Sequence, residues 1–545
     1  MTDKKPLTEV EKVKAASHLL RGTIAQSFEV PETLGIPPSD GHLMKFHGSY
    51  LQDDRDLRDE RAQQKLEPAY SFMLRTRLPG GVCSPTQWLA MDAISQKLAN
   101  GTLRLTTRQA FQLHGILRGD MKGVIGEMQQ VMLDSIAACG DVNRNVMCNP
   151  NPVDSSLHHE ASQWAVRLSE HLLPKSRAYY ELWLDGEKVS GGEEEPLYGA
   201  TYLPRKFKVG LAIPPHNDVD VFSQDLGFIA IIEAGQLAGF NVTVGGGMGA
   251  SHGDPATFPR LGDVIGFVTP EQVLEAAAGV LTVQRDFGDR TNRKHARLKY
   301  TIADRGIAWF VKELEARLSF TLGPARAFAF DHSGDTFGWK EGHDGRWHLT
   351  LHVESGRLAG QALVGLREIA RVHQGDFRLT SNQNLIIASV PAGERAAIDS
   401  LVKQHGLDGY ARATPLRQRA LACVAMPTCG LAMAEAERYL PALTEKVEEL
   451  LSKFGLEEEP ISMRITGCPN GCARPYLAEI ALVGKAPGRY ALYLGGDLKG
   501  QRLNRLVEEN LDEAGVMATL EPLFAAYARS RQPQEPFGDF FVRTA

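Results

Sequence analysis

Gly101-Thr-Leu-Arg-Leu-Thr-Thr-Arg-Gln-Ala-Phe-Gln-Leu113 is matched later in the chain by Gly375-Asp-Phe-Arg-Leu-Thr-Ser-Asn-Gln-Asn-Leu-Ile-Ile387. The two segments lie 274 residues apart, and a glycine, an arginine, a leucine, a threonine and a glutamine coincide in them. A chance match over a short window is the alternative. In both places, however, a strand-like run and then a run with helical spacing come first, and this shared order favours an internal duplication. A duplicated unit predicts two halves related by a pseudo-twofold axis, with a ligand between them.

The runs that precede each segment define the predicted extent of the duplicated unit. Residues 71–78 alternate in part like a strand, and residues 85–98 have the apolar spacing of a helix. Residues 347–353 open the second copy in the same way. We therefore predict a duplicated domain over 71–137 and 338–412. Residues 1–70 are polar and charged, and we expect them to form an N-terminal arm with a helix.

The remaining segments predict two α/β domains, so that the whole chain is a multidomain α+β and α/β protein. Residues 138–337 alternate strand-like and helical runs, which is typical of an α/β domain inserted between the two copies. Residues 413–545 contain further strand-like runs at 479–483 and 490–494. They also contain four of the seven cysteines.

The overall composition excludes several classes of protein. The 545 residues carry a formal net charge of −6, whereas a general nucleic-acid-binding domain is basic. No run of about 18 apolar residues occurs, so we expect no membrane span. The first residues lack the apolar core and the cleavage site of a secretory signal, and we expect a cytoplasmic protein.

Four cysteines form two close pairs, Cys423-x5-Cys429 and Cys468-x3-Cys472. Ordinary buried cysteines are one interpretation. Structural zinc is a second, although its ligand pairs are usually closer than the first pair. An iron–sulfur cluster is the third, since it accepts irregular spacing and since the adjacent prolines and glycine place both pairs in turns with free backbone N–H groups. In a reducing compartment such a group of thiols more often indicates a metal or redox centre than disulfides.

Gly245-Gly-Gly-Met-Gly-Ala250 resembles the glycine fingerprint of a dinucleotide-binding fold. That fingerprint needs a helix to begin at once, so that its N-terminus faces the pyrophosphate. The following Ser-His-Gly-Asp-Pro-Ala-Thr-Phe-Pro cannot start a helix promptly. We therefore expect a loop whose backbone approaches a large flat ligand, and no nicotinamide site.

Cationic residues gather in several short segments in spite of the acidic net charge. The groups are Arg75-Thr-Arg77, Asn143-Arg144-Asn145, Arg205-Lys206-Phe207-Lys208, the run 290–299 with helical spacing, and Arg104, Arg108 and His114 of the duplicated segment. In a strand, Lys206 and Lys208 share one face. Each group alone is most simply explained as a solvated or salt-bridging charge. Together the groups predict an anionic ligand.

Several of these segments, in the same order along the chain, resemble the siroheme-containing sulfite and nitrite reductases. The matching motifs are Cys423-x5-Cys429 with Gly467-Cys-Pro-Asn-Gly-Cys472, Leu103-Arg-Leu-Thr-Thr-Arg-Gln-x-Phe-Gln-Leu-His-Gly115, and Asp141-Val-Asn-Arg-Asn145. Longer phrases at 46–56, 202–208 and 483–490 are similar to the assimilatory sulfite reductase hemoprotein (beta) subunits in particular. The resemblance implies a ferredoxin-like duplicated reductase domain, a siroheme and substrate domain over 138–337 and a cluster domain over 413–545.

The resemblance also implies roles for individual residues. The implied ligands of a 4Fe-4S cluster are Cys423, Cys429, Cys468 and Cys472, of which the last also bridges to the siroheme iron. The implied sulfite-binding cations are Arg75, Arg144, Lys206 and Lys208. The implied siroheme contacts are Arg104, Thr106, Arg108, Gln112, His114 and Asn470. The second copy matches at Arg378 and Asn382 but departs at the counterparts of Arg108 and His114, and it is implied to have lost its cofactor.

The implied reaction is the six-electron reduction of sulfite to sulfide at a siroheme coupled to a 4Fe-4S cluster, in assimilatory sulfate reduction and cysteine biosynthesis. Nitrite reduction to ammonia and a non-catalytic iron–sulfur electron carrier are the alternatives. Because no flavin- or nicotinamide-binding segment is evident, the electrons must come from another protein, by resemblance an NADPH-dependent flavoprotein subunit or a ferredoxin. Lys206 and Lys208 are also candidate proton donors, because crowded like charges lower lysine pKa values.

Overall fold

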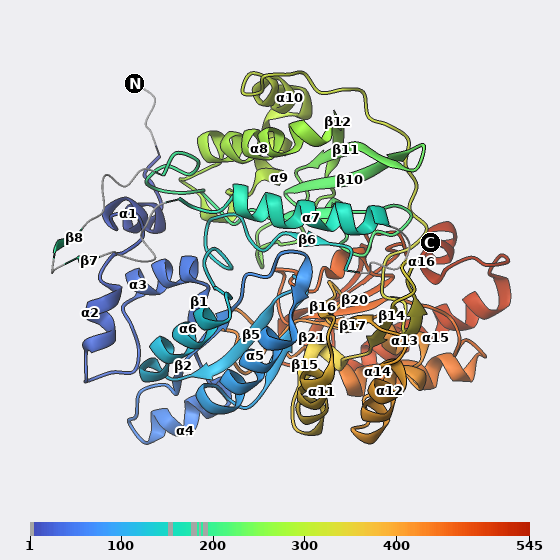
Figure 1. Ribbon diagram of the computed structural model, residues 1–545. Coiled ribbons are helices and arrows are strands. Elements are labelled where there is room, and N and C mark those ends of the chain that lie inside the picture. Colours follow the sequence, from blue (N-terminus) through green and yellow to red (C-terminus); the bar gives the residue numbers. More distant parts are fainter. Residues whose placement is uncertain (1–4, 151–155, 176–182, 185–186, 189–194) are drawn as a thin grey trace.

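The computed structural model describes residues 5–150, 156–175, 183–184, 187–188 and 195–545. Four five-stranded sheets and the helices packed on them form the body of the chain (Figure 1). Two sheets belong to the duplicated unit, one to the middle of the chain and one to its C-terminal part. This mixed architecture confirms the predicted fold class.

Each sheet of the duplicated unit is built from both copies. The first sheet has the order β1 (Ser49–Asp53), β2 (Tyr70–Arg75), β5 (Phe111–Ile116), β4 (Leu103–Leu105) and β15 (Arg357–Leu358). The second has the order β13 (Gly338–Glu341), β14 (Trp347–Leu351), β17 (Leu385–Val390), β16 (Asp376–Leu379) and β3 (Val82–Cys83). Each sheet therefore ends on a short strand donated by the other copy, and this exchange fixes the two copies relative to each other.

Equivalent glycines make the exchange of strands possible. Gly81 (φ +76°) and Gly356 (φ +71°) each lie against a leucine carbonyl of the other copy and a glutamine of their own copy, so that no Cβ fits. The two glutamines, Gln109 and Gln383, also have left-handed backbones, with φ of 53° and 69°. Left-handed non-glycine residues are uncommon, and here they recur at matching positions. The predicted internal duplication is thus confirmed by the backbone as well as by the sequence.

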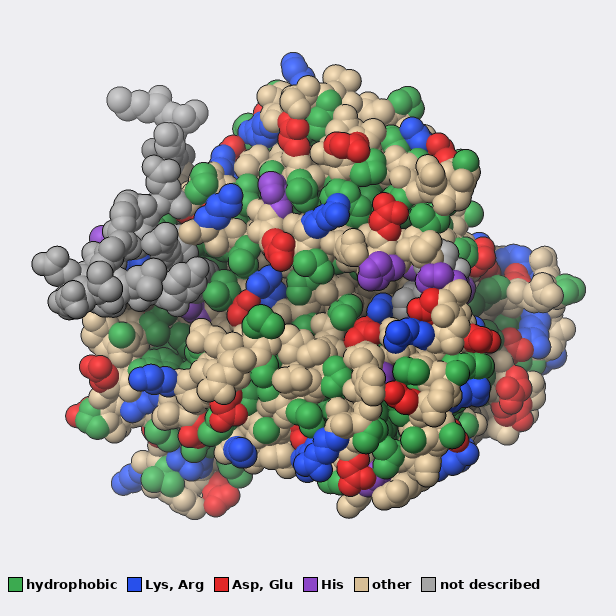
Figure 2. Space-filling view, viewed as in Figure 1, with side chains coloured by type: hydrophobic (Ala, Val, Ile, Leu, Met, Phe, Trp, Pro, Cys, Tyr) green, Lys and Arg blue, Asp and Glu red, His purple; other side chains and the backbone are tan. Residues whose placement is uncertain are grey.

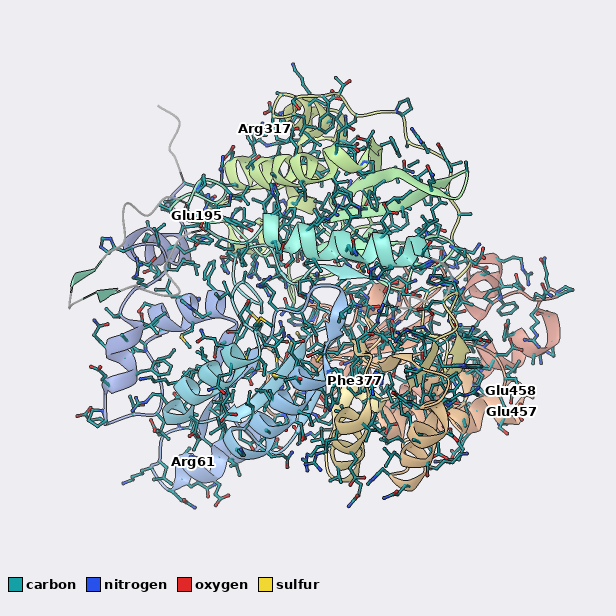
Figure 3. All side chains as sticks on the ribbon, viewed as in Figure 1. Arg61, Glu195, Arg317, Phe377, Glu457 and Glu458 are labelled. Atoms are coloured by element: carbon teal, nitrogen blue, oxygen red, sulfur yellow. The ribbon has the colours of Figure 1, made fainter. Side chains whose placement is uncertain are left out.

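Helices α5 (Pro85–Leu98) and α11 (Gln361–Val372) join the two copies in one core. They pack against each other where the two copies meet (Figure 1). Trp88 of α5 is fully buried and stacks on Phe377 of the second copy, with ring centroids 4.8 Å apart. Figure 3 labels Phe377 at this junction. Burial of two large aromatic side chains across the junction contributes several kcal/mol, about 1.5–3 for each side chain.

The middle of the chain folds around one mixed sheet. Its strand order is β12 (Asp263–Val268), β11 (Gln236–Val244), β10 (Leu226–Glu233), β9 (Val209–Ala212) and β6 (Met147–Cys148). Strand β9 runs parallel to both neighbours, and the other pairs are antiparallel. The helices that pack on this sheet are α7 (Ser156–His171), α8 (Val273–Phe287), α9 (Leu298–Arg305) and α10 (Ile307–Glu315) (Figure 1). The α/β character predicted for this segment is confirmed.

The C-terminal part folds around a second mixed sheet. Its strand order is β18 (Ala420–Ala422), β19 (Met463–Thr466), β20 (Ile480–Ala486), β21 (Arg489–Leu494) and β22 (Arg505–Leu511). Strands β18, β19 and β20 are parallel, whereas β21 and β22 are antiparallel to their neighbours. The core is closed by helices α14 (Leu440–Lys453), α15 (Glu513–Ser530) and α16 (Phe537–Thr544). The strand-like runs predicted at 479–483 and 490–494 correspond to β20 and β21.

The N-terminal segment contains more structure than the predicted arm with one helix. It forms α1 (Glu9–Ala16), α2 (Ile24–Glu29), α3 (Pro38–Leu43) and α4 (Arg58–Gln63). Strand β1 pairs with β2 and is the edge strand of the first sheet. Its sequence, Ser49-Tyr-Leu-Gln-Asp53, alternates too weakly to predict a strand, so its place depends on β2.

The surface of the molecule is mixed in charge. Figure 2 shows acidic and basic side chains interspersed over one face, in agreement with the small net charge. Within the described ranges, none of the helices has the length and apolar character that crossing a membrane requires.

Candidate cofactor and anion site

The two cysteine pairs lie at the carboxyl ends of neighbouring parallel strands. Cys423 directly follows β18, and Cys468 lies two residues beyond the end of β19, to which β18 is hydrogen-bonded. Parallel strands bring their carboxyl ends to one edge of a sheet, so the topology alone brings the pairs together. The amide of Gly467 donates to Sγ of Cys423 at 3.3 Å, and Nδ2 of Asn470 donates to Sγ of Cys468 at 3.5 Å.

All seven cysteines are free thiols, and those of the two pairs influence one another. Burial raises the pKa of Cys423, and Cys472 and Cys429 raise it further. Burial and the nearby Cys472 raise the pKa of Cys468 to about 11. In the described ranges, however, no three His, Cys, Asp or Glu side chains converge as they would on one metal ion. A cluster, in which each thiolate holds its own iron, does not require the thiols to converge on one ion as a single zinc does.

A glycine-rich loop from the middle sheet packs directly on the second cysteine loop. It follows β11, and the amide of Ala250 donates to the carbonyl of Pro469 at 2.8 Å. Gly471 has a φ of +63°, and the carbonyl of Met248 lies so close that a Cβ has no room. Two loops from different sheets therefore meet backbone to backbone beside the cysteines.

The sequence predicted that the glycine loop does not begin a helix as a dinucleotide-binding turn would, and the structure agrees. Residues 245–269 are all described and contain no helix, and the next helical turn begins at Pro270. The ammonium of Lys299 lies under the loop instead and donates to the carbonyls of Gly247 and Gly249, at 3.1 and 2.5 Å. The lysine thus stabilises the loop in an irregular, non-helical backbone conformation.

Two of the four predicted substrate cations, Arg75 and Lys206, interact electrostatically with the thiol Cys472, and Lys206 lies near the other two, Arg144 and Lys208. Arg75 ends β2, Arg144 precedes β6, and Lys206 and Lys208 precede β9. Strands of three different sheets therefore bring the sequence-predicted cations and cysteines to one place.

Lys206 and Lys208 are partly buried, and no carboxylate among the described residues forms an ion pair with either of them. In the part of the chain that the structure describes, neither ammonium group makes a hydrogen bond or an ion pair. Burial, together with Arg205 and Arg297, lowers the pKa of Lys206 to about 7. Burial and the neighbouring Lys206 lower the pKa of Lys208 well below its ordinary value. Cations that are desolvated and left without a counter-ion are typical of an anion-binding site.

A chain of hydrogen bonds holds Arg75 in place. Nη2 of Arg75 donates to Oε1 of Gln112 at 2.6 Å, and Nε2 of Gln112 donates to Nε2 of His114 at 2.8 Å. Nδ1 of His114 then donates to Oε1 of Gln52 at 3.2 Å. Burial and nearby arginines lower the pKa of His114 well below its ordinary value, so the ring is neutral and its proton lies on Nδ1. The hydrogen bonds of Gln112 and His114 thus orient Arg75.

Arg104 lies between the first copy and the first cysteine loop. It forms an ion pair with Glu437, and its Nη2 donates to the carbonyl of Ala422 at 3.0 Å. Glu437 also accepts from Nε of Arg357 at 2.6 Å, and its amide donates to the carbonyl of Cys423 at 3.1 Å. Glu437, which the sequence did not single out, therefore holds one arginine from each copy beside a cysteine.

Thr106 and Arg108 shape the turn between β4 and β5. Oγ1 of Thr106 accepts from the amides of Arg108 and Ala110, each at 3.3 Å. Nη1 of Arg108 reaches Oε1 of Gln224 in the middle of the chain at 3.0 Å. The buried Nε of Arg108 has no hydrogen-bond partner among the described residues. An orphaned buried donor is expected where a ligand completes the site.

The run 290–299 is not the cationic face of one helix, and that part of the prediction was wrong. A 3-10 turn covers Arg293–His295, and α9 begins later, at Leu298. The arginines of the run pair instead with buried acids: Arg290 with Glu11, Arg293 with Asp141 and Arg297 with Asp225. The salt-bridging explanation is therefore the right one for the arginines of this group.

Some residues that shape the site were not singled out as site residues from the sequence. Arg55, in the N-terminal segment, donates to the carbonyls of Cys429 and Ala432, at 3.1 and 2.6 Å. Arg474 pairs with Asp220 of the middle segment. Arg474 follows the motif Cys468-Pro-Asn-Gly-Cys472 by two residues and could have been noticed there. Arg55 lies in the matching phrase 46–56, but its partners and those of Asp220 could not be inferred, because they lie far away along the chain.

Two family models match the chain. The model described as "Nitrite/Sulfite reductase ferredoxin-like half domain" matches residues 64–131 and 340–415, which cover most of each copy of the duplicated unit. The model described as "Nitrite and sulphite reductase 4Fe-4S domain" matches residues 163–322, which contain most of the middle sheet. The four cysteines of the site lie outside this second range, at the edge of the C-terminal sheet.

Known proteins match over nearly the whole chain. A protein of Myxococcus xanthus (strain DK1622) named sulfite reductase (NADPH) hemoprotein beta-component is 66% identical, over 99% of this chain and 97% of its own length. A protein of the same name from Geobacillus thermodenitrificans (strain NG80-2) is 58% identical, over 99% of this chain and 96% of its own length. The solved structure of Mycobacterium tuberculosis NirA protein has a TM-score of 0.82 at 25% identity, and the match covers 99% of this chain and 97% of that one.

Proposed function

This chain belongs to the nitrite and sulfite reductase family, among the sulfite reductase hemoprotein beta-components, and from that membership we propose how its site works. It reduces sulfite to sulfide, a six-electron reaction, with siroheme and a 4Fe-4S cluster as cofactors. The observation that carries this function is the meeting of four free thiols with unpartnered, partly buried cations in one place.

The residues present fit both cofactors. Four free thiols on two adjoining loops fit a cluster held by cysteines. Siroheme carries several carboxylates and sulfite is an anion, and donors of Arg108, Lys206 and Lys208 have no partner within the described ranges. When bound, the two cofactors supply the path for single electrons and the open iron position that holds the substrate.

We assign the cluster to Cys423, Cys429, Cys468 and Cys472, and we propose that Cys472 also ligates the siroheme iron. Among these four thiols Cys472 is the exposed one. It is also the one that interacts electrostatically with both Arg75 and Lys206 on the substrate side. A thiolate shared between the cluster and the siroheme iron has to be accessible to the siroheme and to lie near the substrate cations.

We assign the siroheme carboxylates to the first copy of the duplicated unit. The proposed contacts are Arg104, Thr106, Arg108, Gln112, His114 and Asn470. Arg104 and Arg108 supply positive charge, and Arg108 has a donor left for a ligand. Gln112 and His114 are neutral and tied to Arg75, so their part is to fix that arginine where it borders the cofactor.

We assign sulfite to Arg75, Arg144, Lys206 and Lys208. Arg144 donates to the carbonyls of Gly140 and Ala138 through Nε and Nη1, at 2.8 and 3.3 Å, which leaves Nη2 for an oxyanion. The pKa of Lys206 of about 7 suits a group that donates protons near neutral pH as oxygen leaves sulfite as water.

We propose that the functional parts of the chain follow the predicted boundaries. These are an N-terminal arm over 1–70, the duplicated domain over 71–137 and 338–412, the siroheme and substrate domain over 138–337, and the cluster domain over 413–545. The four sheets support this division. Strand β1 is the exception, because it lies in the arm but completes a sheet of the duplicated domain.

We propose that an NADPH-dependent flavoprotein supplies the electrons. The names of the relatives include NADPH, which supports this donor over a ferredoxin. The glycine loop, which resembles a nicotinamide site in sequence, opens no helix and does not provide one in this chain. Turnover with NADPH and a purified flavoprotein subunit tests the proposal. A chain that turns over with reduced ferredoxin and not with the flavoprotein contradicts it.

The absorption spectrum of the purified protein, with and without sulfite, tests the cofactors and the open iron position together. Siroheme gives visible bands that a cluster alone does not, and sulfite should shift them. A spectrum without siroheme bands supports the electron carrier instead. Turnover of sulfite and nitrite with a chemical reductant then compares the two substrates, and a much larger kcat/KM for nitrite overturns the choice of sulfite.

A further inference from the structure

Arg474 makes the same hydrogen bond to both copies of the duplicated unit. Its Nη1 donates to the carbonyl of Thr107 at 3.1 Å, and its Nη2 donates to the carbonyl of Ser381 at 3.0 Å. Thr107 and Ser381 occupy equivalent positions, 274 residues apart. The two arms of one guanidinium group thus contact equivalent atoms, so the side chain lies on the pseudo-twofold axis between the two turns.

The third donor of Arg474 reaches a different part of the chain. Its Nε donates to Oδ2 of Asp220, a fully buried carboxylate that also accepts from Arg464 at 2.8 Å. Asp220 belongs to the middle segment and has a left-handed backbone, with φ of 47°. A buried charge is tolerated when it is paired and fully hydrogen-bonded, as here. Arg474 therefore joins both copies and the middle segment through one planar group, a geometry that lysine cannot reproduce.

The same residue is coupled to Cys472 through the backbone. Arg474 lies two residues after Cys472, and its amide donates to the carbonyl of Gly471 at 3.0 Å. The hydroxyl of Thr107 donates to the carbonyl of Cys472 at 3.0 Å. Arg474 has a φ of 53°, so the turn that carries Cys472 is held in an uncommon conformation. Thr107 is bonded to the carbonyl of Cys472 on one side and to Arg474 on the other, which closes a ring of contacts that includes the backbone of Cys472.

We propose that Arg474 is a positioning residue that aligns Cys472 with the first-copy turn by locking both copies and Asp220 to the cysteine loop. This inference rests on the proposed function for the role of Cys472 as the shared thiolate. It goes beyond that function because it assigns the geometry of the coupling to a residue that touches neither the cluster thiols nor the substrate cations.

A purely structural arginine is the alternative, and the chain contains a matched example. Arg367 of α11 pairs with the buried Asp92 of α5, and its Nη2 lies 3.1 Å from Oδ1 of that carboxylate. This pair also joins the two copies of the duplicated unit. It lies between two helices and has no contact with a cysteine loop. Removal of Arg367 therefore weakens the same junction without disturbing Cys472.

The test compares Arg474→Lys and Arg474→Met with Arg367→Met in the holoenzyme. We expect Arg474→Lys to keep the fold and the sulfite KM, to lower kcat about tenfold or more, and to weaken the magnetic coupling between cluster and siroheme iron. We also expect amide hydrogen exchange in 106–110, 380–384 and 470–474 to become about tenfold faster. Arg367→Met should lower the unfolding temperature and leave coupling, kcat and exchange at 470–474 unchanged.

Two results overturn the proposal. One is a wild-type coupling spectrum and wild-type exchange in Arg474→Lys. The other is the same pattern of changes in Arg474→Met and Arg367→Met, which marks Arg474 as merely structural. If Arg474→Met does not fold, the comparison of Arg474→Lys with Arg367→Met decides. If the proposed function itself is wrong, the wild-type protein will lack siroheme bands. Amide hydrogen exchange will still show whether Arg474 holds the ring of contacts, so the two failures can be told apart.

Discussion

The turns 106–110 and 380–384 have the same backbone design and differ in what their side chains bind. In the first, Oγ1 of Thr106 accepts two amides of the turn, and in the second, Oγ1 of Thr380 does the same, at 3.2 and 3.0 Å. Arg108 of the first turn reaches away to the middle of the chain and retains a buried N–H without a partner in the described residues. The first turn therefore has donor capacity to spare for a ligand.

In the second turn a carboxylate of the chain itself takes the place of a ligand. Asp335 accepts from Oγ1 of Thr380 at 2.6 Å, from Nδ2 of Asn382 at 3.0 Å and from Nδ2 of Asn384 at 2.7 Å. All three donors belong to one turn and converge on one acidic side chain. The two copies therefore differ less in fold than in the donors that the protein leaves unsatisfied.

The strands that follow the two turns, β5 and β17, also differ, because β5 has polar side chains where β17 has apolar ones. Gln112 and His114 of β5 form a polar chain that orients Arg75. Their counterparts 274 residues later are Ile386 and Ala388, which are 2% and 0% exposed. The second copy is therefore closed by apolar packing where the first is polar. The second copy thus keeps the turn but not the polar residues that orient Arg75 in the first copy.

Replacement of Cys472 should have the largest effect, and it involves the first turn alone, because the backbone of Cys472 is hydrogen-bonded to that turn and not to the second. Thr107 of that turn donates to the carbonyl of Cys472, whereas the equivalent Ser381 donates to the carbonyl of Asp218. We expect Cys472→Ser to lower kcat about a thousandfold or more, since a hydroxyl is a poor substitute for a bridging thiolate. Magnetic spectra and iron content measure the loss of coupling. Cys148→Ser, at a buried thiol outside the site, is the control and should retain the coupling.

Removal of a lysine charge gives the next largest effect. We expect Lys206→Met to lower kcat by about 10²–10⁴ while sulfite still binds, as for the loss of a general acid. In the wild type the protonated lysine is the active form, so kcat/KM should fall as the pH rises above about 7, and Lys206→Met should lack this limb. A bound anion raises the lysine pKa, so the fall in kcat itself should occur at a higher pH.

Lys294→Met is the matched control for this prediction. Lys294 is an exposed lysine of the basic run 290–299, and its replacement should leave the pH profile unchanged. Full turnover of Lys206→Met, with sulfite bound normally, contradicts the role of Lys206 as a proton donor. A change of KM without a change of kcat indicates a lysine that binds the anion and donates no proton.

The sequence contains most of what is needed to find the site. The cysteine pairs are recognisable from spacing, and the parallel order of β18 and β19 then brings them together. The duplication is recognisable because both copies keep the same turn chemistry. Arg75, Arg144, Lys206 and Lys208 were predicted as substrate cations by resemblance. The structure brings Arg75 and Lys206 within electrostatic range of Cys472, and Arg144 and Lys208 near Lys206, while the roles of all four stay predictions.

The remainder could not be predicted, for physical reasons. The exchanged strands β3 and β15 have two residues each, too few for any periodicity. The run 290–299 has helical spacing, but its arginines serve acids such as Glu11 and Asp141 that are distant in sequence. Asp335 has no local signal either, because a single aspartate in a loop becomes informative when its three partners are known.

Gln112→Ile gives the first copy the residue that the second copy has at the equivalent position, Ile386. The substitution removes the acceptor of Arg75 and the partner of His114, so Arg75 loses its fixed orientation. We expect the sulfite KM to rise about tenfold, as for the loss of one hydrogen bond to a charged group, with a small change in kcat. The reciprocal Ile386→Gln should lower the free energy of unfolding by about 1–3 kcal/mol and leave the KM unchanged. A raised KM in Ile386→Gln contradicts the assignment of sulfite to the first copy.

Replacement of Asp335 has the smallest expected effect on turnover and tests the second copy directly. Asp335→Asn leaves donors of Thr380, Asn382 and Asn384 without a charged acceptor, which should destabilise the fold by about 1–3 kcal/mol and change kcat less than about twofold. Asp331→Asn, at an exposed position of the same segment, should change neither. If the turn 380–384 can still bind an anion, added acetate should restore the unfolding temperature of Asp335→Gly, since a ligand that binds the folded chain stabilises it. A loss of turnover in Asp335→Asn as large as that of Lys206→Met makes the second turn part of the working site and ends the distinction between the copies.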